Sequence, residues 1–166
     1  MVKDLINQLN IVKVIKKGDI VLSHGEETNF YIDIKKAYGY PSARKLICDY
    51  LCESLDKRVN CVAGSGHGGI SPASIIADRL GIHLTLIRKQ TKGYGLDSII
   101  DGYVPTPSDF VSIIDDVFTT GGTLRGIIEV LEPTGTDILD CLVIVKRGEG
   151  ELNIPLKYLI KGTDLT

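Results

Sequence analysis

The sequence has no excess of basic residues. Its 166 residues include 19 lysines and arginines against 21 aspartates and glutamates, which gives a formal net charge of −2. Proteins that bind nucleic acid usually present a basic face, so we expect no nucleic-acid partner and only a local anion site. Long apolar runs are also missing, because the first 20 residues are amphipathic with scattered charges. That pattern excludes a secretory signal or membrane span in this segment, and we expect no membrane contact.

Metal-binding cysteine patterns are absent as well. The four cysteines include an i, i+4 pair, Cys48 and Cys52, but no CxxC pair and no histidine at zinc-ligand spacing. We therefore expect buried free thiols. Free thiols fit a reducing compartment, which predicts a cytoplasmic protein.

Internal repeats, low-complexity tracts and Pro/Ser-rich linkers are missing too, so we expect a single domain over residues 1–166. Apolar spacing predicts a helix over 3–14, and two strand-like runs follow, joined by a turn at His24-Gly25. A second helix is expected over 42–55.

After residue 59, short apolar strands alternate with amphipathic helices. The predicted strands are NCVAG, HLTLIRK, DFVSIIDD and DILDCLVIVKR, and the predicted helices are SPASIIADRLG and GTLRGIIEVLE. This alternation predicts an α/β fold with a mostly parallel central sheet flanked by helices. Such sheets bind ligands beyond the carboxyl ends of their strands, where both glycine-rich turns are expected. Residues 91–109 lack clear periodicity and are expected to form a functional loop or a hairpin.

The most informative segment is FVSIIDDVFTTGGTLRG, residues 110–126. Asp115 and Asp116 end an apolar strand, and ionised carboxylates, which only accept hydrogen bonds, suit a vicinal diol or a cation bound to one. Gly121 and Gly122 permit positive φ and close backbone approach, so successive amide groups can point at one phosphate beside a helix start. Acids followed by a phosphate cradle predict a site for a ribose 5-phosphate group. The GK[ST] lysine of a P-loop is missing.

A second segment, RKQTKGYG at residues 88–95, follows a predicted strand and places three cations beside two glycines. Mobile cationic loops suit the capture of a diphosphate. Both segments also have purely structural interpretations. The acidic segment would then be a turn that caps a helix, with Asp116 or Thr119 at the N-cap, and the cationic segment a solvated surface loop.

The acidic segment resembles the motif by which type I phosphoribosyltransferases bind phosphoribosyl diphosphate (PRPP): an apolar strand, two acids and a TTGG-type loop. Three further segments resemble the orotate phosphoribosyltransferase branch. Its RK..K.HG loop matches residues 88–95, its SG..S.YY.D.K segment matches VLSHGEETNFYIDIK at 21–35, and its DR..G segment matches VKRGEG at 145–150. Together the matches span nearly all of the chain.

The resemblance implies transfer of the 5-phosphoribosyl group from PRPP to orotate, giving orotidine 5′-monophosphate and diphosphate, with Mg²⁺ as cofactor. It implies the type I phosphoribosyltransferase fold, with a small N-terminal hood over residues 1–40 and a core over 41–166. It also implies a homodimer in which the Arg88 to Gly95 loop reaches the neighbouring site.

Residue roles are implied by the same matches. Catalytic roles fall on Lys92, Arg88, Lys89 and Asp116. PRPP contacts are implied for Asp115, Asp116, Val117, Phe118, Thr119, Thr120, Gly121, Gly122, Thr123, Arg88, Lys89, Lys92, Tyr94 and Lys35. Thr119 and Arg147 would contact orotate, since an arginine fork matches a carboxylate. No residue is assigned as a direct metal ligand, because Mg²⁺ would be bound mainly through PRPP.

The sequence also departs from the family pattern. Tyr94 replaces the usual loop histidine, so a titrating imidazole is not expected there. His24 replaces a usual serine, Lys146 replaces a frequent aspartate, and the first glycine-rich loop reads AGSGHGG where a glutamate is common. These differences concern the base more than PRPP. The alternatives are therefore a phosphoribosyltransferase for another base, purine or uracil, and a non-catalytic PRPP-responsive regulator.

One glycine-rich segment, GSGHGG at residues 64–69, also satisfies the GxGxxG pattern of dinucleotide-binding proteins. The acid that such proteins place about 20 residues later is absent. The next predicted strand instead ends in Ile87-Arg88-Lys89. Under the phosphoribosyltransferase interpretation, residues 65–69 supply backbone N–H groups to the diphosphate, and His67 is either a ligand contact or a turn residue.

Overall fold

The computed structural model describes residues 2–21, 25, 27–89 and 99–165. Helices and strands follow one another along the chain in this order: α1 (Lys3–Val12), β1 (Ile15–Val21), β2 (Glu27–Ile32), α2 (Ile34–Tyr38), α3 (Pro41–Ser54), β3 (Cys61–Ser65), α4 (Gly66–Leu80), β4 (His83–Ile87), β5 (Ile100–Gly102), β6 (Phe110–Phe118), α5 (Gly122–Leu131), β7 (Asp137–Lys146) and β8 (Leu156–Lys161). Short 3₁₀ helices cover Glu132–Thr134 and Gly162–Leu165.

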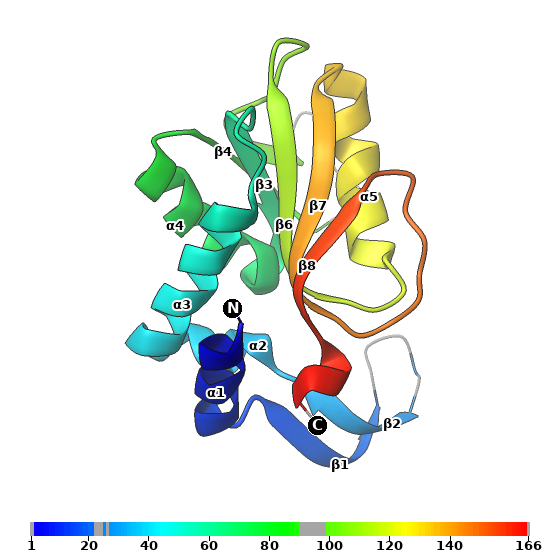
Figure 1. Ribbon diagram of the computed structural model, residues 1–166. Helices are drawn as coiled ribbons and strands as arrows, with labels where there is room; N and C mark the ends of the chain where they lie inside the picture. The colour runs from blue at the N-terminus through cyan, green and yellow to red at the C-terminus, as the bar shows by residue number, and fades with distance from the viewer. Residues whose placement is uncertain (1, 22–24, 26, 90–98, 166) are drawn as a thin grey trace.

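A six-stranded sheet forms the centre of the molecule, in the order β5-β4-β3-β6-β7-β8 (Figure 1). Neighbouring strands are parallel except for the β4–β5 pair. The prediction of a mostly parallel, helix-flanked sheet is therefore confirmed. β1 and β2 form a separate antiparallel pair beyond the carboxyl ends of the parallel strands, next to the C-terminus (Figure 1).

Helices cover both faces of the sheet, and the period of two along each strand decides which side chains face which layer. Ile113 of β6 belongs to the apolar cluster beneath α5, whereas its neighbour Ile114 belongs to the cluster beneath α3 and α4. Val143 and Leu142 of β7 divide between the same two clusters. Strands buried on both faces explain the uninterrupted apolar runs of the sequence.

The N-terminal elements share the apolar cluster on the α3/α4 side. Leu5 and Leu9 of α1 and Ile34 of α2 are fully buried in it, together with Ile47 of α3. The end of the molecule that contains β1 and β2 is thereby anchored to the sheet by hydrophobic packing. None of the helices in the described residues is long and apolar enough to span a bilayer.

The start of α4 and the end of β6 differ from the sequence-based expectations, and two further elements are present. α4 begins at Gly66, so most of the expected glycine turn is the first turn of that helix. Its glycines are required by close packing, because a Cβ on Gly69 would lie 2.5 Å from the carbonyl oxygen of Ile114. β6 continues past the two acids to Phe118. α2 and β8 were not expected, since both are short and have no turn signal of their own.

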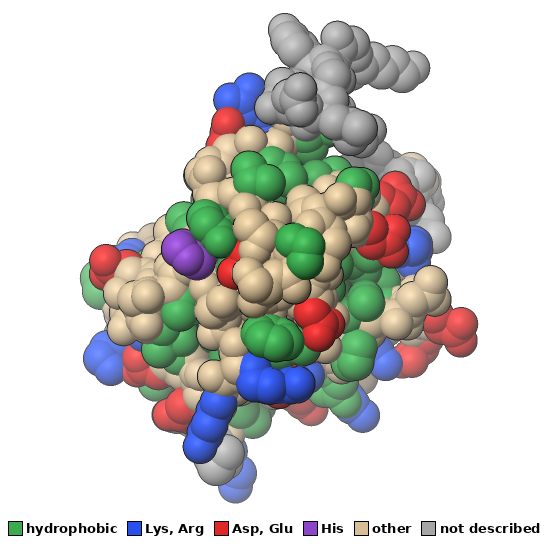
Figure 2. Space-filling view, turned by 90° about the horizontal axis from the view of Figure 1, so that it is seen from above, with side chains coloured by type: hydrophobic (Ala, Val, Ile, Leu, Met, Phe, Trp, Pro, Cys, Tyr) green, Lys and Arg blue, Asp and Glu red, His purple; other side chains and the backbone are tan. Residues whose placement is uncertain are grey.

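The unassigned stretch before β6 contains β5, which pairs antiparallel with β4. The hairpin alternative for residues 91–109 is therefore confirmed in part, and residues 90–98 lie outside the described residues. On the face seen in Figure 2, from the amino ends of the parallel strands, acidic and basic side chains are interspersed along the rim.

Candidate active site

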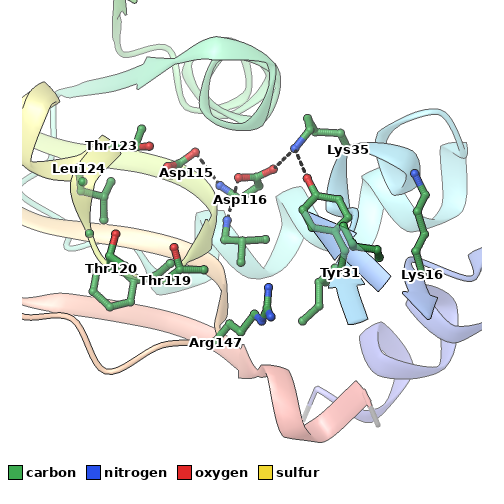
Figure 3. Close-up of a pocket in the computed structure, with 16 residues that line it drawn as sticks. Lys16, Tyr31, Lys35, Asp115, Asp116, Thr119, Thr120, Thr123, Leu124 and Arg147 are labelled. Carbon is green, nitrogen blue, oxygen red and sulfur yellow. Dashed lines mark hydrogen bonds and ion pairs between the residues drawn. The ribbon is translucent and has the colours of Figure 1, made fainter. Parts of the chain in front are cut away.

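A cavity of about 720 Å³ opens at the carboxyl end of β6, between the sheet and the β1–β2 pair. The residues that line it come from β1, β2, α2, β6, the bend before α5 and the end of β7: Lys16, Ile20, Tyr31, Ile32, Lys35, Asp115, Asp116, Val117, Phe118, Thr119, Thr120, Gly121, Gly122, Thr123, Leu124 and Arg147. Figure 3 shows the acids at the centre, with the threonines on one side and the lysines on the other. Eleven of these sixteen residues were predicted from the sequence.

The two acids are buried and held by backbone donors. Asp115 and Asp116 are 7% and 8% exposed. The Asp116 amide donates to Oδ1 of Asp115 at 2.9 Å, and the Val117 amide donates to Oδ1 of Asp116 at 2.8 Å. Lys35 Nζ lies 3.0 Å from Oδ2 of Asp116 and also contacts the Tyr31 hydroxyl at 3.5 Å (Figure 3). The carboxylates therefore have fixed orientations before any ligand binds.

Electrostatic strain accompanies this arrangement. Burial, and after it repulsion from the adjacent Asp116 carboxylate, together raise the pKa of Asp115 to about 7. Burial of Lys35 works against its charge, but the attraction and hydrogen bond of Asp116 outweigh that effect, so the pKa of Lys35 is raised. In the free protein Asp115 is therefore partly protonated near neutral pH.

Replacing Asp115 tests the effect of its buried charge on the stability of the free protein. A carboxyl group whose pKa is raised on folding stabilises the folded state at low pH. This stabilisation is lost as the pH rises from about 4, the pKa of an unfolded aspartate, towards 7. Asp115→Asn removes the buried charge but keeps an oxygen for the Asp116 amide. The variant should be more stable than the parent by roughly 4 kcal/mol at pH 8 and nearly equal to it at pH 3, below the pKa of an unfolded aspartate, when denaturant unfolding is followed at both values. An equal difference at the two pH values would contradict the assignment.

The bend between β6 and α5 is shaped by glycines from two segments. Gly121, with φ of +82°, is the N-cap of α5, and no side chain caps that helix. The interpretation of Asp116 or Thr119 as a helix cap is therefore wrong. The RGEG segment after β7 passes directly against the bend, since a Cβ on Gly148 would clash with the Thr119 carbonyl oxygen and one on Gly150 would lie 2.5 Å from that of Thr120.

A matched pair of glycine variants tests this packing. Gly148→Ala should push the RGEG segment away from the bend, lowering the free energy of unfolding by about 2 kcal/mol and weakening PRPP binding. Gly126→Ala, in α5 with no atom within 4 Å of its added Cβ, should be neutral or slightly stabilising. Thermal unfolding and calorimetric titration measure both effects. Equal behaviour of the two variants would show that the contact has no role.

Arg147 lies at the end of β7 and points into the cavity from the side opposite Lys35 (Figure 3). Its guanidinium carbon is 4.6 Å from the centre of the Phe30 ring, a cation–π contact that joins β2 to the core. Its amide donates to the Phe118 carbonyl at 2.8 Å, which fixes its backbone beside the acid strand. Arg147 and Thr119, the two residues predicted to contact a base, therefore line the same cavity.

Five cavity residues were missed by the sequence analysis. Tyr31 and Ile32 fall inside the quoted N-terminal segment, so that resemblance could have identified them. Lys16, whose Nζ lies 2.7 Å from Oδ2 of Asp33, had no signal beyond that of an ordinary strand lysine. The remaining two are apolar: Ile20 and Leu124.

A second, smaller hollow of about 340 Å³ contains the described part of the cationic segment. Arg88 and Lys89 line it together with Gly66 and His67 of the first turn of α4. The Arg88 guanidinium forms a fork with the carboxylate of Asp101, with Nη2 3.0 Å from Oδ1. The structure thus separates these two cations from the acid cavity.

The glycine turn connects the two hollows. Gly66 lies under Lys89, since a Cβ on Gly66 would be 3.3 Å from Cε of that lysine, and Gly68 abuts the Asp116 carboxyl group. The remaining predicted contacts, Lys92 and Tyr94, and the His24 position lie outside the described residues.

Comparisons with known proteins agree with this geometry. No protein-family model matches the sequence. The orotate phosphoribosyltransferase of Methanopyrus kandleri is 35% identical over 160 residues, covering 93% of this chain and 86% of that protein. The enzyme of the same name from Thermococcus kodakarensis is 36% identical over 159 residues, covering 93% and 85%. The crystal structure of orotate phosphoribosyltransferase from Aeropyrum pernix matches with a TM-score of 0.86 and 31% identity, covering 97% of this chain and 95% of that one.

The helix-flanked, mostly parallel sheet and the cavity at the carboxyl end of its central strand define the type I phosphoribosyltransferase fold. Sequence identities above 30% to the two curated enzymes, over most of both chains, identify the family within this fold class. This chain belongs to the orotate phosphoribosyltransferase family.

Proposed function

We propose that this protein transfers the 5-phosphoribosyl group of PRPP to orotate, giving orotidine 5′-monophosphate and diphosphate in pyrimidine biosynthesis. The observation that supports it most is one cavity lined by the acid pair, the threonine-glycine bend and Arg147. The acids suit the ribose hydroxyls, the bend suits the 5-phosphate and the arginine suits a base that has its own carboxylate.

The 5-phosphate would lie at the bend. Amide groups at the start of α5 have no partner within the helix, and the helix dipole favours a negative charge there. Thr119, Thr120 and Thr123 add hydroxyl donors around the same point. The ribose would then extend towards Asp115 and Asp116, whose carboxylates accept hydrogen bonds from the two hydroxyls.

Orotate would lie between Arg147 and Thr119, with its carboxylate on the guanidinium fork. Lys16 and Lys35 add positive charge on the opposite side of the cavity. A purine has no carboxylate to pair with the Arg147 guanidinium, so the cavity favours an acidic base.

The reaction breaks the bond between C1 of the ribose and the diphosphate oxygen and forms a bond from C1 to the base nitrogen. Negative charge grows on the diphosphate while the ribose ring becomes positive, so the enzyme must stabilise the leaving group. We assign this role to Arg88, Lys89, Lys92 and the first-turn amides of α4. Asp116 would hold the ribose ring while positive charge develops on that ring. Lys35 and Tyr94 are also assigned as PRPP contacts.

Mg²⁺ would be bound mainly through PRPP. Among the described residues, no group of three or more His, Cys, Asp or Glu converges as a metal site. Asp115 and Asp116 nevertheless supply the carboxylate oxygens that Mg²⁺ prefers. When bound, the ion would neutralise part of the diphosphate charge.

We extend the proposal to a homodimer in which the Arg88 to Gly95 loop serves the neighbouring subunit. The separation of Arg88 and Lys89 from the acid cavity supports this arrangement. We also propose that residues 1–40 act as a hood over a core of residues 41–166. A cytoplasmic location is supported by the four free cysteines, which fit a reducing compartment.

A panel of bases tests the function. With PRPP and Mg²⁺, orotate should be consumed, whereas uracil, adenine, hypoxanthine and xanthine should react at least about 100-fold more slowly, because none of them pairs with Arg147. Faster turnover of another base would show that this base, rather than orotate, is the substrate. PRPP binding without turnover of any base would favour the PRPP-responsive regulator.

Arg147 provides a residue-level test. Arg147→Gln should raise the KM for orotate by about 30-fold or more, because a charge-assisted fork contributes roughly 2 kcal/mol, while the KM for PRPP changes little. Arg125→Gln is the control, since Arg125 donates to the Glu151 carbonyl and does not line the cavity. A larger effect on PRPP than on orotate would reverse the assignment of the two subsites.

A further inference from the structure

The short helix α2 contacts the acid site and the glycine turn through two side chains one helical turn apart. Lys35 Nζ lies 3.0 Å from Oδ2 of Asp116. The hydroxyl of Tyr38 donates to the carbonyl oxygen of Gly68 at 2.8 Å. Residues three apart on a helix lie on the same face, so both contacts come from one side of α2.

Gly68 is the point at which the glycine turn meets the acid pair. A Cβ at this position would lie 2.6 Å from the carboxyl carbon of Asp116, so the α4 backbone packs directly on that side chain. Gly68 belongs to the first turn of α4, whose amide groups lack partners within the helix. The distance between these amides and the Asp116 carboxylate is therefore determined by where Gly68 lies.

Tyr38 is well placed to determine that position. Its side chain is partly buried, and burial raises the pKa of its hydroxyl well above the usual value, with further contributions from Asp116 and Asp115. The hydroxyl therefore remains a donor throughout the physiological pH range. The backbone of Tyr38 is fixed in turn, because Nη1 of Arg44 donates to its carbonyl oxygen at 2.5 Å.

We propose that Tyr38 is a positioning residue for the diphosphate end of PRPP. By holding the Gly68 carbonyl it fixes the first-turn amides of α4 relative to Asp116, so that one ligand can meet both. Tyr38 does not line the cavity, so it acts through Gly68 rather than on the ligand. The proposal rests on the proposed function for the identity of the ligand. It predicts that loss of the hydroxyl weakens PRPP binding and leaves orotate binding unchanged.

The test compares Tyr38→Phe with Tyr50→Phe. The Tyr50 hydroxyl donates to Oδ1 of Asp4 at 2.6 Å, at the contact between α1 and α3. Removing this hydroxyl therefore also removes a tyrosine hydrogen bond, but one that lies away from the site. Calorimetric titration with Mg·PRPP gives the Kd for each protein, and steady-state assays give the KM for PRPP and for orotate. Thermal unfolding shows whether each variant folds.

Tyr38→Phe should raise the Kd and the KM for PRPP about fivefold, as expected for one lost hydrogen bond, with the KM for orotate unchanged. Tyr50→Phe should leave all three constants unchanged. Unchanged PRPP constants in Tyr38→Phe would overturn the proposal, as would an equal rise in both KM values. If the wild type binds Mg·PRPP but does not turn over orotate, the proposed base fails while the Kd ratio still tests Tyr38. If the wild type does not bind Mg·PRPP, both proposals fail.

Discussion

Two carboxyl groups buried side by side at the end of β6 are the constraint on which the rest of the site depends. Among the described residues, one ion pair involves these acids, and it joins Lys35 to Asp116. A pair of buried acids with one partial counter-charge destabilises the free protein. A bound ligand can relieve this arrangement, and the proposed ribose diol with its associated cation would do so. The acid pair therefore lowers the stability of the free protein in a way that favours ligand binding.

Close backbone packing keeps that strained pair in place. Two chain segments approach the end of β6 so tightly that glycine is required at three contacts: Gly68 against Asp116, Gly148 against Thr119 and Gly150 against Thr120. Each contact joins an element of the core to the strand or bend that would bind PRPP. Two side chains of α2 add polar contacts, Lys35 to Asp116 and Tyr38 to Gly68. The proposed phosphoribosyl site is thus built from backbone geometry as much as from side-chain chemistry.

The sheet and its central motif could be predicted because their signals are local. Apolar strands such as 110–118, followed by acids and glycines, determine both the strand and the bend that ends it. Features that depend on long-range packing were not predictable: α2 has only five residues, and its Tyr38 meets Gly68 across 30 positions of sequence. The start of α4 was misplaced because glycines disfavour helices locally, whereas contact with Ile114 requires them there. Lys16 was missed because a single strand lysine has no distinguishing pattern.

Direct titration of Mg·PRPP into the wild-type protein and into the Asp115→Asn/Asp116→Asn double variant tests the central claim. Both proteins should fold, as judged by cooperative thermal unfolding, because amides keep the shape of the carboxyl groups. The wild type should bind Mg·PRPP, and the double variant should show no binding heat at the same concentrations. Normal affinity in a folded double variant would show that the acid pair does not bind the ribose.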